Sequence, residues 1–102
     1  MKTVFSMHER FGSFLADGNL ANKFRFTEVE PALSAVGEIV LDFSGVRNMT
    51  TSFSNGLVAT LVAHFPTEFA KQVRFRGCDP LIKELLQASI AIGTREALAA
   101  AG

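Results

Sequence analysis

The sequence predicts an α/β fold in which a buried central strand leads into a packed helix. Residues 39–43 read Ile-Val-Leu-Asp-Phe, which is typical of a strand covered on both faces. Apolar residues then recur every four positions from Phe53 to Phe65, as on one side of a helix. A second strand-like segment, residues 72–76, precedes another helical pattern. Because such alternation implies helical crossovers, we expect a partly parallel sheet covered by helices.

The first residues predict a strand, because Thr3, Phe5 and Met7 alternate with their neighbours in the manner of a sheet. Residues 11–15 are compatible with either a second strand or an irregular return of the chain. The Asp-Gly-Asn sequence at 17–19 is a turn signal.

Residues 20–33 are expected to be mostly helical. Thr27 and Glu30 could form a capping box for a helix that begins at Glu28. Pro31 would then stand near the tolerated first turn of that helix.

Two other interpretations of this segment remain open. One is a single kinked helix that begins at Leu20, and the other is a short strand at residues 24–26 before the Thr27 cap. In each case the segment 34–38, which contains Gly37, should end the helix.

The central helix is expected to begin after an N-cap at Thr51 or Ser52, because hydroxyl side chains are preferred there. It should run to about Phe65, where Pro66 stops it. In the strand at 72–76, alternate residues should face inward and outward.

Asp79 and Pro80 mark the start of a further helix, with an acid at the N-cap and proline at the first helical position. Thr94 can cap a short C-terminal helical tail over residues 94–101. We expect one domain over residues 1–102, with its core within about residues 3–92. The residues predicted to share one core are Val40, Leu41, Phe43, Leu57, Leu61, Val73, Phe75, Leu85 and Leu86.

The composition disfavours several classes of function. Ten basic and ten acidic residues give a net charge of zero, which argues against nucleic acid or an anionic membrane as the partner. Cys78 is the single cysteine, so an intramolecular disulfide is excluded, and with two histidines a zinc site is disfavoured. No membrane span or secretory signal is evident. We therefore expect a cytoplasmic protein without a bound metal or cofactor.

Asp42 is the acid in an otherwise apolar strand, so it should accept backbone N–H groups from the next loop or contact a ligand at the edge of the sheet. Thr50, Thr51 and Ser52 crowd one helix start. They could cap the helix, contact a ligand or be phosphorylated, since a helix N-terminus favours anions. These four residues are the candidate binding edge.

Other polar residues are less suggestive of a site. His8 and His64 belong to no recognisable triad, and His64 is expected to be a partly exposed packing residue. Cys78 is expected to be a buried structural cysteine; the alternative is that the helix start after it lowers the pKa of its thiol. The glycines form no phosphate-binding loop. Three arginines could be solvated or could bind a phosphate or an acidic face: Arg25, Arg74 and Arg76.

The residues from 39 to 53 resemble the centre of a STAS domain, and more specifically the STAS-like family of uncharacterised function. The resemblance is carried by the acid-ended strand, the Gly45-Val46 loop and the Met-Thr-Thr-Ser-Phe sequence at 49–53. Phe24-Arg25, followed after five residues by Pro-Ala-Leu, is similar to that family's first helix. The resemblance covers about residues 14–92. It implies a central mixed β-sheet with helices packed mainly on one face.

The resemblance also implies a function. STAS domains include bacterial anti-anti-sigma factors, which bind a GHKL-type ATPase or kinase and are switched by phosphorylation at the matching position, here Ser52. Those factors usually read Asp-Ser-Ser-Gly where this chain reads Thr-Thr-Ser-Phe at 50–53. The leading hypothesis is a non-enzymatic regulatory module that binds a protein partner, with a homodimer possible. The alternatives are a domain that senses a small ligand or nucleotide at the same helix N-terminus, and an enzyme.

Overall fold

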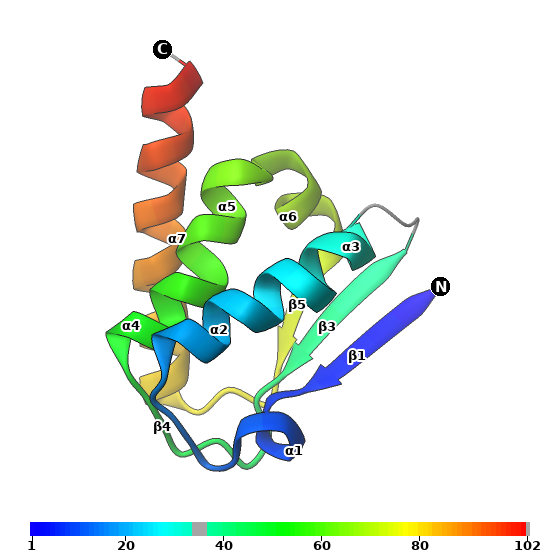
Figure 1. The fold of residues 1–102 in the computed structure, drawn as a ribbon, viewed down its shortest axis with the longest axis vertical. Helices are drawn as coiled ribbons and strands as arrows, with labels where there is room; N and C mark the ends of the chain where they lie inside the picture. Colours follow the sequence, from blue (N-terminus) through cyan, green and yellow to red (C-terminus); the bar gives the residue numbers. More distant parts are fainter. Residues whose placement is uncertain (34–36, 102) are drawn as a thin grey trace.

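The computed structural model describes residues 1–33 and 37–101, in which a parallel sheet is covered by helices on one face (Figure 1). The sheet has three strands in the order β1-β3-β5, and all its pairings are parallel. The described strands are thus all parallel, where the sequence predicts a partly parallel sheet and the resemblance a mixed one. Its strands are β1 (Lys2–Ser6), β3 (Glu38–Asp42) and β5 (Val73–Arg76).

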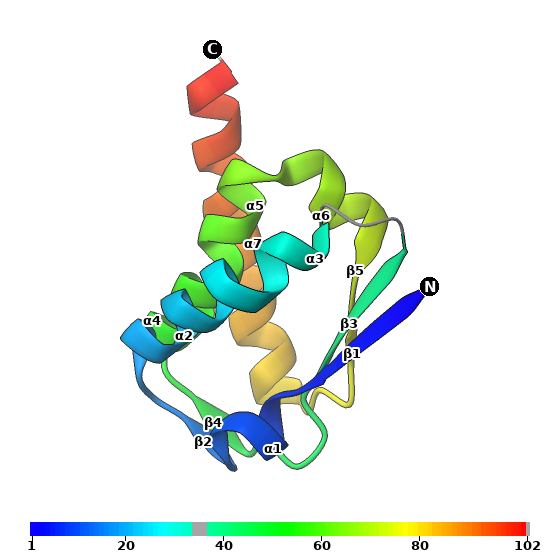
Figure 2. The same cartoon turned by 45° about the vertical axis from the view of Figure 1, so that its right-hand side comes forward.

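The helices lie together on one side of this sheet, as the turned view in Figure 2 shows. The predicted α/β fold with helices mainly on one face is therefore confirmed. A second, two-stranded parallel pair, β2 (Phe14–Leu15) with β4 (Asn48–Met49), lies at the end of the molecule where β1 and β3 finish. The two shorter helices are α1 (Met7–Phe11) and α6 (Pro66–Gln72).

Each of two long helices contains one π-helical stretch. The first, called the α2–α3 helix, comprises α2 (Gly18–Phe24), a π-helical segment (Arg25–Val29) and α3 (Glu30–Leu33). The second, called the α4–α5 helix, comprises α4 (Thr51–Ser54), a π-helical segment (Asn55–Ala59) and α5 (Thr60–His64). The last helix is α7 (Pro80–Ala101).

The α4–α5 helix lies between the α2–α3 helix and α7. Glycine residues allow it to pack closely against both neighbours. A Cβ atom at Gly56 would lie 3.2 Å from the carbonyl oxygen of Gly18 in α2. A Cβ atom at Gly93 of α7 would meet the Ala59 carbonyl oxygen and lie 2.7 Å from Val62 Cβ. The α4–α5 helix is thus enclosed on two sides.

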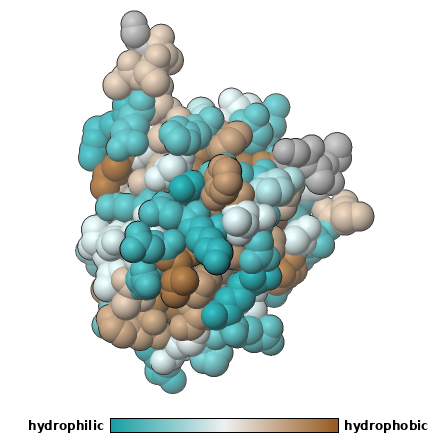
Figure 3. Space-filling model, in the orientation of Figure 1, coloured by the Kyte–Doolittle hydropathy of each residue, from teal (hydrophilic) through white to brown (hydrophobic). Residues whose placement is uncertain are grey.

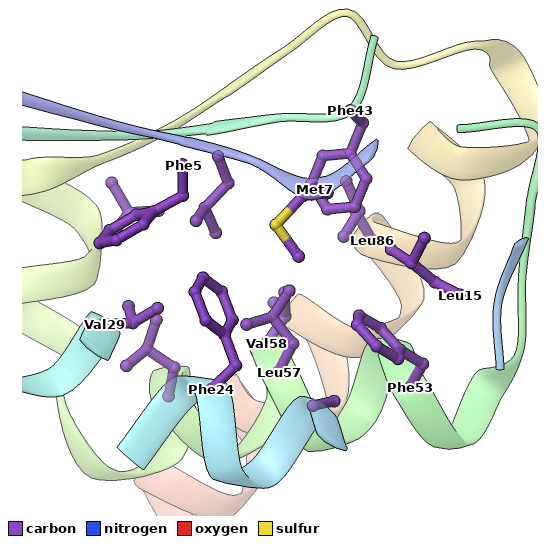
Figure 4. Close-up of a cluster of buried hydrophobic side chains, with 14 of the residues drawn as sticks. Phe5, Met7, Leu15, Phe24, Val29, Phe43, Phe53, Leu57, Val58 and Leu86 are labelled. Atoms are coloured by element: carbon purple, nitrogen blue, oxygen red, sulfur yellow. The ribbon is translucent and has the colours of Figure 1, made fainter. Parts of the chain in front are cut away.

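The core lies between the sheet and these helices (Figure 4). Phe5 and Met7 point from the sheet side toward Phe24 and Val58 of the helices. The rings of Phe5 and Phe24 meet edge to face at 5.3 Å. Eight of the nine predicted core residues are either buried in this core or partly buried against it.

Val40 is the exception. It is buried, but it alternates with Ile39 and Leu41 along β3, so it lies on the face of the sheet that the helices leave open. It pairs with Val4, which is 45% exposed, and with Arg74. An apolar run predicts a strand, but it does not say which of its residues face the helices.

Several predicted element boundaries were wrong. Met7 begins α1 and does not extend the first strand. The Asp-Gly-Asn sequence at 17–19 is a helix start, because the Asp17 carboxylate accepts hydrogen bonds from the N–H groups of Asn19 and Leu20. Residues 14 and 15 form a strand, which is one of the two interpretations given for the segment 11–15.

The α2–α3 helix begins at Gly18, close to the one-helix interpretation from Leu20, and neither a capping box nor a strand interrupts it. The Thr27 hydroxyl donates to the carbonyl of Lys23, 2.7 Å away, so Thr27 is not a cap. Thr94 similarly donates to Ile90, and residues 94–101 prolong α7 as one helix. The expected helix end at 34–38 falls largely on residues 34–36, which lie outside the described residues.

Most other boundaries agree with the sequence, but β4 lies where only a connection between strand and helix was predicted. The α4–α5 helix ends at His64, before Pro66. Pro66 is also the first residue of α6, a helix that the sequence reasoning missed. The Asp79 carboxylate accepts the N–H of Ile82 at the start of α7, as predicted.

Candidate functional site

The α4–α5 helix begins at an exposed edge of the molecule, and its cap is Thr50. The Thr50 hydroxyl accepts the Phe53 N–H at 3.1 Å and donates to the Ala16 carbonyl at 2.9 Å. The Thr50 N–H donates to Leu15, 2.9 Å away. The expectation of an N-cap at Thr51 or Ser52 was therefore wrong by one or two residues, because Thr50 is the hydroxyl residue with extended backbone.

Thr51 and Ser52 occupy the first turn of the helix and are exposed. Ser52 lies directly against Gly18, where a Cβ atom would overlap the Ser52 hydroxyl oxygen. The first turns of α2 and α4 consequently lie side by side, as both ribbon views show. Within the described residues, no hydrogen bond occupies the Thr51 or Ser52 hydroxyl, so both are available at this edge.

Below this first turn, a buried polar link ties the helix to α7. Ser54 and Ser89 are buried, and their hydroxyl oxygens are 2.6 Å apart. Ser89 donates to the Asn55 side-chain oxygen at 2.7 Å, so the Ser54 hydroxyl shares its proton between Ser89 and the Leu85 carbonyl oxygen, which is 3.2 Å away. Satisfied buried hydroxyls of this kind hold two helices in one register.

A second polar link ties the π-helical segment of the α4–α5 helix to the α2–α3 helix. The Thr60 N–H donates to Asn55, five residues back, so Gly56 loses its usual α-helical donor. The Arg25 Nε supplies the missing donor at 3.0 Å. Arg25 also pairs with Glu30 at 2.8 Å, and these side chains are 11% and 16% exposed.

Asp42 lies at the end of β3, and its two carboxylate oxygens are already engaged. One accepts the Ser44 N–H at 2.9 Å, and the other forms an ion pair with Arg76 at 2.9 Å. The bonds from Ser44, followed by those from Arg76, lower the pKa of Asp42 to about 2. The sequence predicted this role for Asp42, in which its carboxylate accepts a backbone N–H group of the next loop. Among the described contacts, none joins Asp42 to the hydroxyl residues at 50–52.

The other candidate residues serve the fold. The Arg74 guanidinium donates to carbonyl oxygens at the end of α6 and the start of β5. His64 is exposed, whereas partial burial was expected. Cys78 is half-buried, and burial raises the pKa of its thiol, which contradicts the reactive interpretation based on the helix start.

Sequence reasoning did not single out Ser54, Asn55 and Ser89. A signal was present, because Ser54 and Ser89 each stand at helical spacing with apolar residues that are buried. Local patterning does not predict the role of Arg25, since that role depends on a carbonyl 31 residues away.

Residues 1–33 and 37–101 contain neither a metal-binding cluster nor a membrane-spanning helix. No group of three histidine, cysteine or acidic side chains is placed to hold a metal ion. No helix in that part of the chain has both the length and the apolar character needed to cross a membrane.

Comparison with known proteins gives one match. A family model described as a STAS-like domain of unknown function matches residues 20–83. This segment includes the α2–α3 helix from Leu20 onward, β3, the α4–α5 helix and β5. No curated protein and no solved structure matches the chain.

Proposed function

Because the chain belongs to the family of STAS-like domains of unknown function, we propose that it is a non-enzymatic regulatory module that binds a protein partner. The binding edge would be the first turn of the α4–α5 helix. The observation that carries this proposal is the pair of exposed hydroxyl residues, Thr51 and Ser52, on a helix start that Thr50 and Gly18 hold in place. A preorganised edge loses little conformational entropy when a partner binds.

The partner that we propose is a GHKL-type ATPase or kinase, in a bacterial-type signalling system of the cytoplasm. Ser52 would be the regulated residue, as in anti-anti-sigma factors. A phosphate at the first turn would lie near free helix N–H groups, so the fold would tolerate it. The edge would nevertheless gain nearly two negative charges, which would repel an acidic partner surface.

Both carboxylate oxygens of Asp42 are engaged within the chain, so the role of Asp42 in this proposal is to hold the loop that follows β3. The same helix start would also suit a small anionic ligand, which is the competing function. The two hypotheses differ in what should bind and in what a charge at position 52 should do.

Purified chain should be mixed with each GHKL-type ATPase encoded by the same genome, and affinity measured by titration calorimetry. We expect one saturable complex, a loss of affinity of about tenfold or more for Ser52→Asp, and retained binding for Ser52→Ala. Thr94→Asp is the matched control, because Thr94 is an exposed hydroxyl residue in the middle of α7.

The outcome that overturns the proposal is the absence of any complex, together with a nucleotide that raises the melting temperature of the chain. Turnover of a nucleotide by the purified chain, abolished by Ser52→Ala, would instead establish an enzyme.

A further inference from the structure

Two large apolar side chains are exposed close to the Ser52 edge. Phe14 of β2 is 55% exposed and Leu20 of α2 is 48% exposed. Between them is a hollow of about 310 Å³, with buried Leu15 and Phe53 among its lining residues. Exposed apolar surface rimmed by polar residues is characteristic of interaction sites.

A second hollow of about 230 Å³ adjoins the first, because both are lined by Arg10, Phe11 and Leu20. It continues along α2 past Lys23 and Phe24. The two hollows together are called the α1–α2 groove. Figure 3 shows brown and tan residues gathered on the lower part of this face, with teal residues around them.

The charges on the rim of this groove are unequal. Arg10 and Glu28 neutralise each other at 2.6 Å, and Asp17 caps α2. Lys23 is exposed and forms no ion pair with any residue in the described ranges. In the second hollow, the charge left without an ion partner is therefore cationic, whereas in the first hollow the Asp17 carboxylate keeps its negative charge.

The groove is continuous with the proposed binding edge. Phe53, in the lining of the first hollow, is the residue after Ser52, and Ser52 touches Gly18, between the lining residues Asp17 and Leu20. Thr50 bonds to the carbonyl of Ala16, another lining residue. A partner that covers Ser52 would thus also cover this groove.

We infer that the α1–α2 groove binds an amphipathic helix of the protein partner, an inference that rests on the proposed function. Apolar side chains three or four residues apart on that helix would enter the two hollows, as in other helix-in-groove complexes. An acidic side chain beside them would face Lys23. A second copy of the chain is the competing occupant, and sedimentation distinguishes it from a partner helix.

The probe for this inference is a phage-displayed library of random peptides of about 15 residues, roughly four helical turns. Selection on the whole chain should enrich peptides with apolar residues at helical spacing and at least one acid. Leu20→Glu should weaken the enriched peptides about tenfold or more, and Lys23→Glu by a smaller factor.

The matched control is Phe26→Glu. Phe26 lies on the same helix, is 68% exposed and lines neither hollow, so its substitution should leave the affinity unchanged. Both positions are exposed, and circular dichroism should show that both variants remain folded.

Failure to enrich such peptides, or equal binding to Leu20→Glu and the unsubstituted chain, overturns the inference. Self-association in sedimentation that is lost in Leu20→Glu overturns it in favour of a second copy. Peptides that need Leu20 but ignore Ser52→Asp support the groove and count against the Ser52 switch. If Ser52→Asp weakens the binding of a GHKL-type partner and Leu20→Glu does not, the proposed function is supported and the inference about the groove is overturned.

Discussion

The start of the α4–α5 helix is open to solvent at Thr51 and Ser52, whereas its middle turns are enclosed. Thr51 and Ser52 are exposed, while Leu57 and Leu61 have no accessible surface. One face of the enclosed part meets α2 at Gly56, and another meets α7 at Gly93. One helix therefore combines a rigid interior with an exposed end.

Substitutions at the exposed start and in the enclosed turns should therefore affect different properties of the protein. In the enclosed turns, a lost methylene or hydrogen bond cannot be replaced by water, so stability should fall. In the first turn, water can replace most lost contacts, so stability should change little. Binding to a partner is the property that substitutions there would affect.

The largest effect is expected from Leu61→Ala in the enclosed region. Leu61 is fully buried in the core, so the variant should lose about 2–5 kcal/mol of unfolding free energy, depending on how far the cavity collapses. Urea denaturation measures this loss. Leu98→Ala on α7 is the control, because Leu98 is exposed, and a similar loss there would show that the comparison does not rest on burial.

A somewhat smaller effect is expected from Arg25→Met, which removes the donor to Gly56 and the partner of Glu30. Both charges are largely buried, so the variant should be destabilised by about 2–4 kcal/mol.

The more exposed ion pair provides the comparison. Arg10 and Glu28 are 37% and 39% exposed, and Met can keep contact with the Phe5 and Phe24 rings that the Arg10 guanidinium covers, so Arg10→Met should cost about 1 kcal/mol or less. Equal losses for the two arginine variants in thermal denaturation would contradict the argument that burial sets the energy.

Asp42→Asn should have a pH-dependent effect. The folded-state pKa of about 2 lies below the ordinary value of 3.8, so Asp42 contributes stability above pH 4 that is lost as the pH falls through 2. Because Arg76 is half exposed, we expect about 1–2 kcal/mol at neutral pH, vanishing near pH 2. Denaturant midpoints measured across this range test it, and a constant difference between the two proteins would exclude the ionised pair as its cause.

Sequence patterns predicted the parts of the molecule that depend on periodicity, such as β3 and the apolar side of the α4–α5 helix. Caps were harder to assign, because a hydroxyl can bond either an N–H ahead of it or a carbonyl four residues behind. Thr50 does the first, whereas Thr27 and Thr94 do the second. The π-helical segment Asn55–Ala59 frees a carbonyl that is bonded by a distant donor, Arg25, and no local pattern predicts this donor. Within the site, the sequence shows the cluster of hydroxyl residues. The exposed groove beside it could not be predicted, because it forms only where α1 packs against α2.

The smallest effects separate the cap from the proposed binding residue. Thr50→Ala removes the acceptor of the Phe53 N–H and should cost about 0.5–2 kcal/mol. Ser52→Ala removes a hydroxyl without a bond in the described part of the chain, so it should change stability by about 0.5 kcal/mol or less. Both variants can be compared by chemical denaturation and by partner titration. A large loss of stability for Ser52→Ala would mean that its contact with Gly18 supports the junction of the two helices, and Ser52 would then be a structural residue.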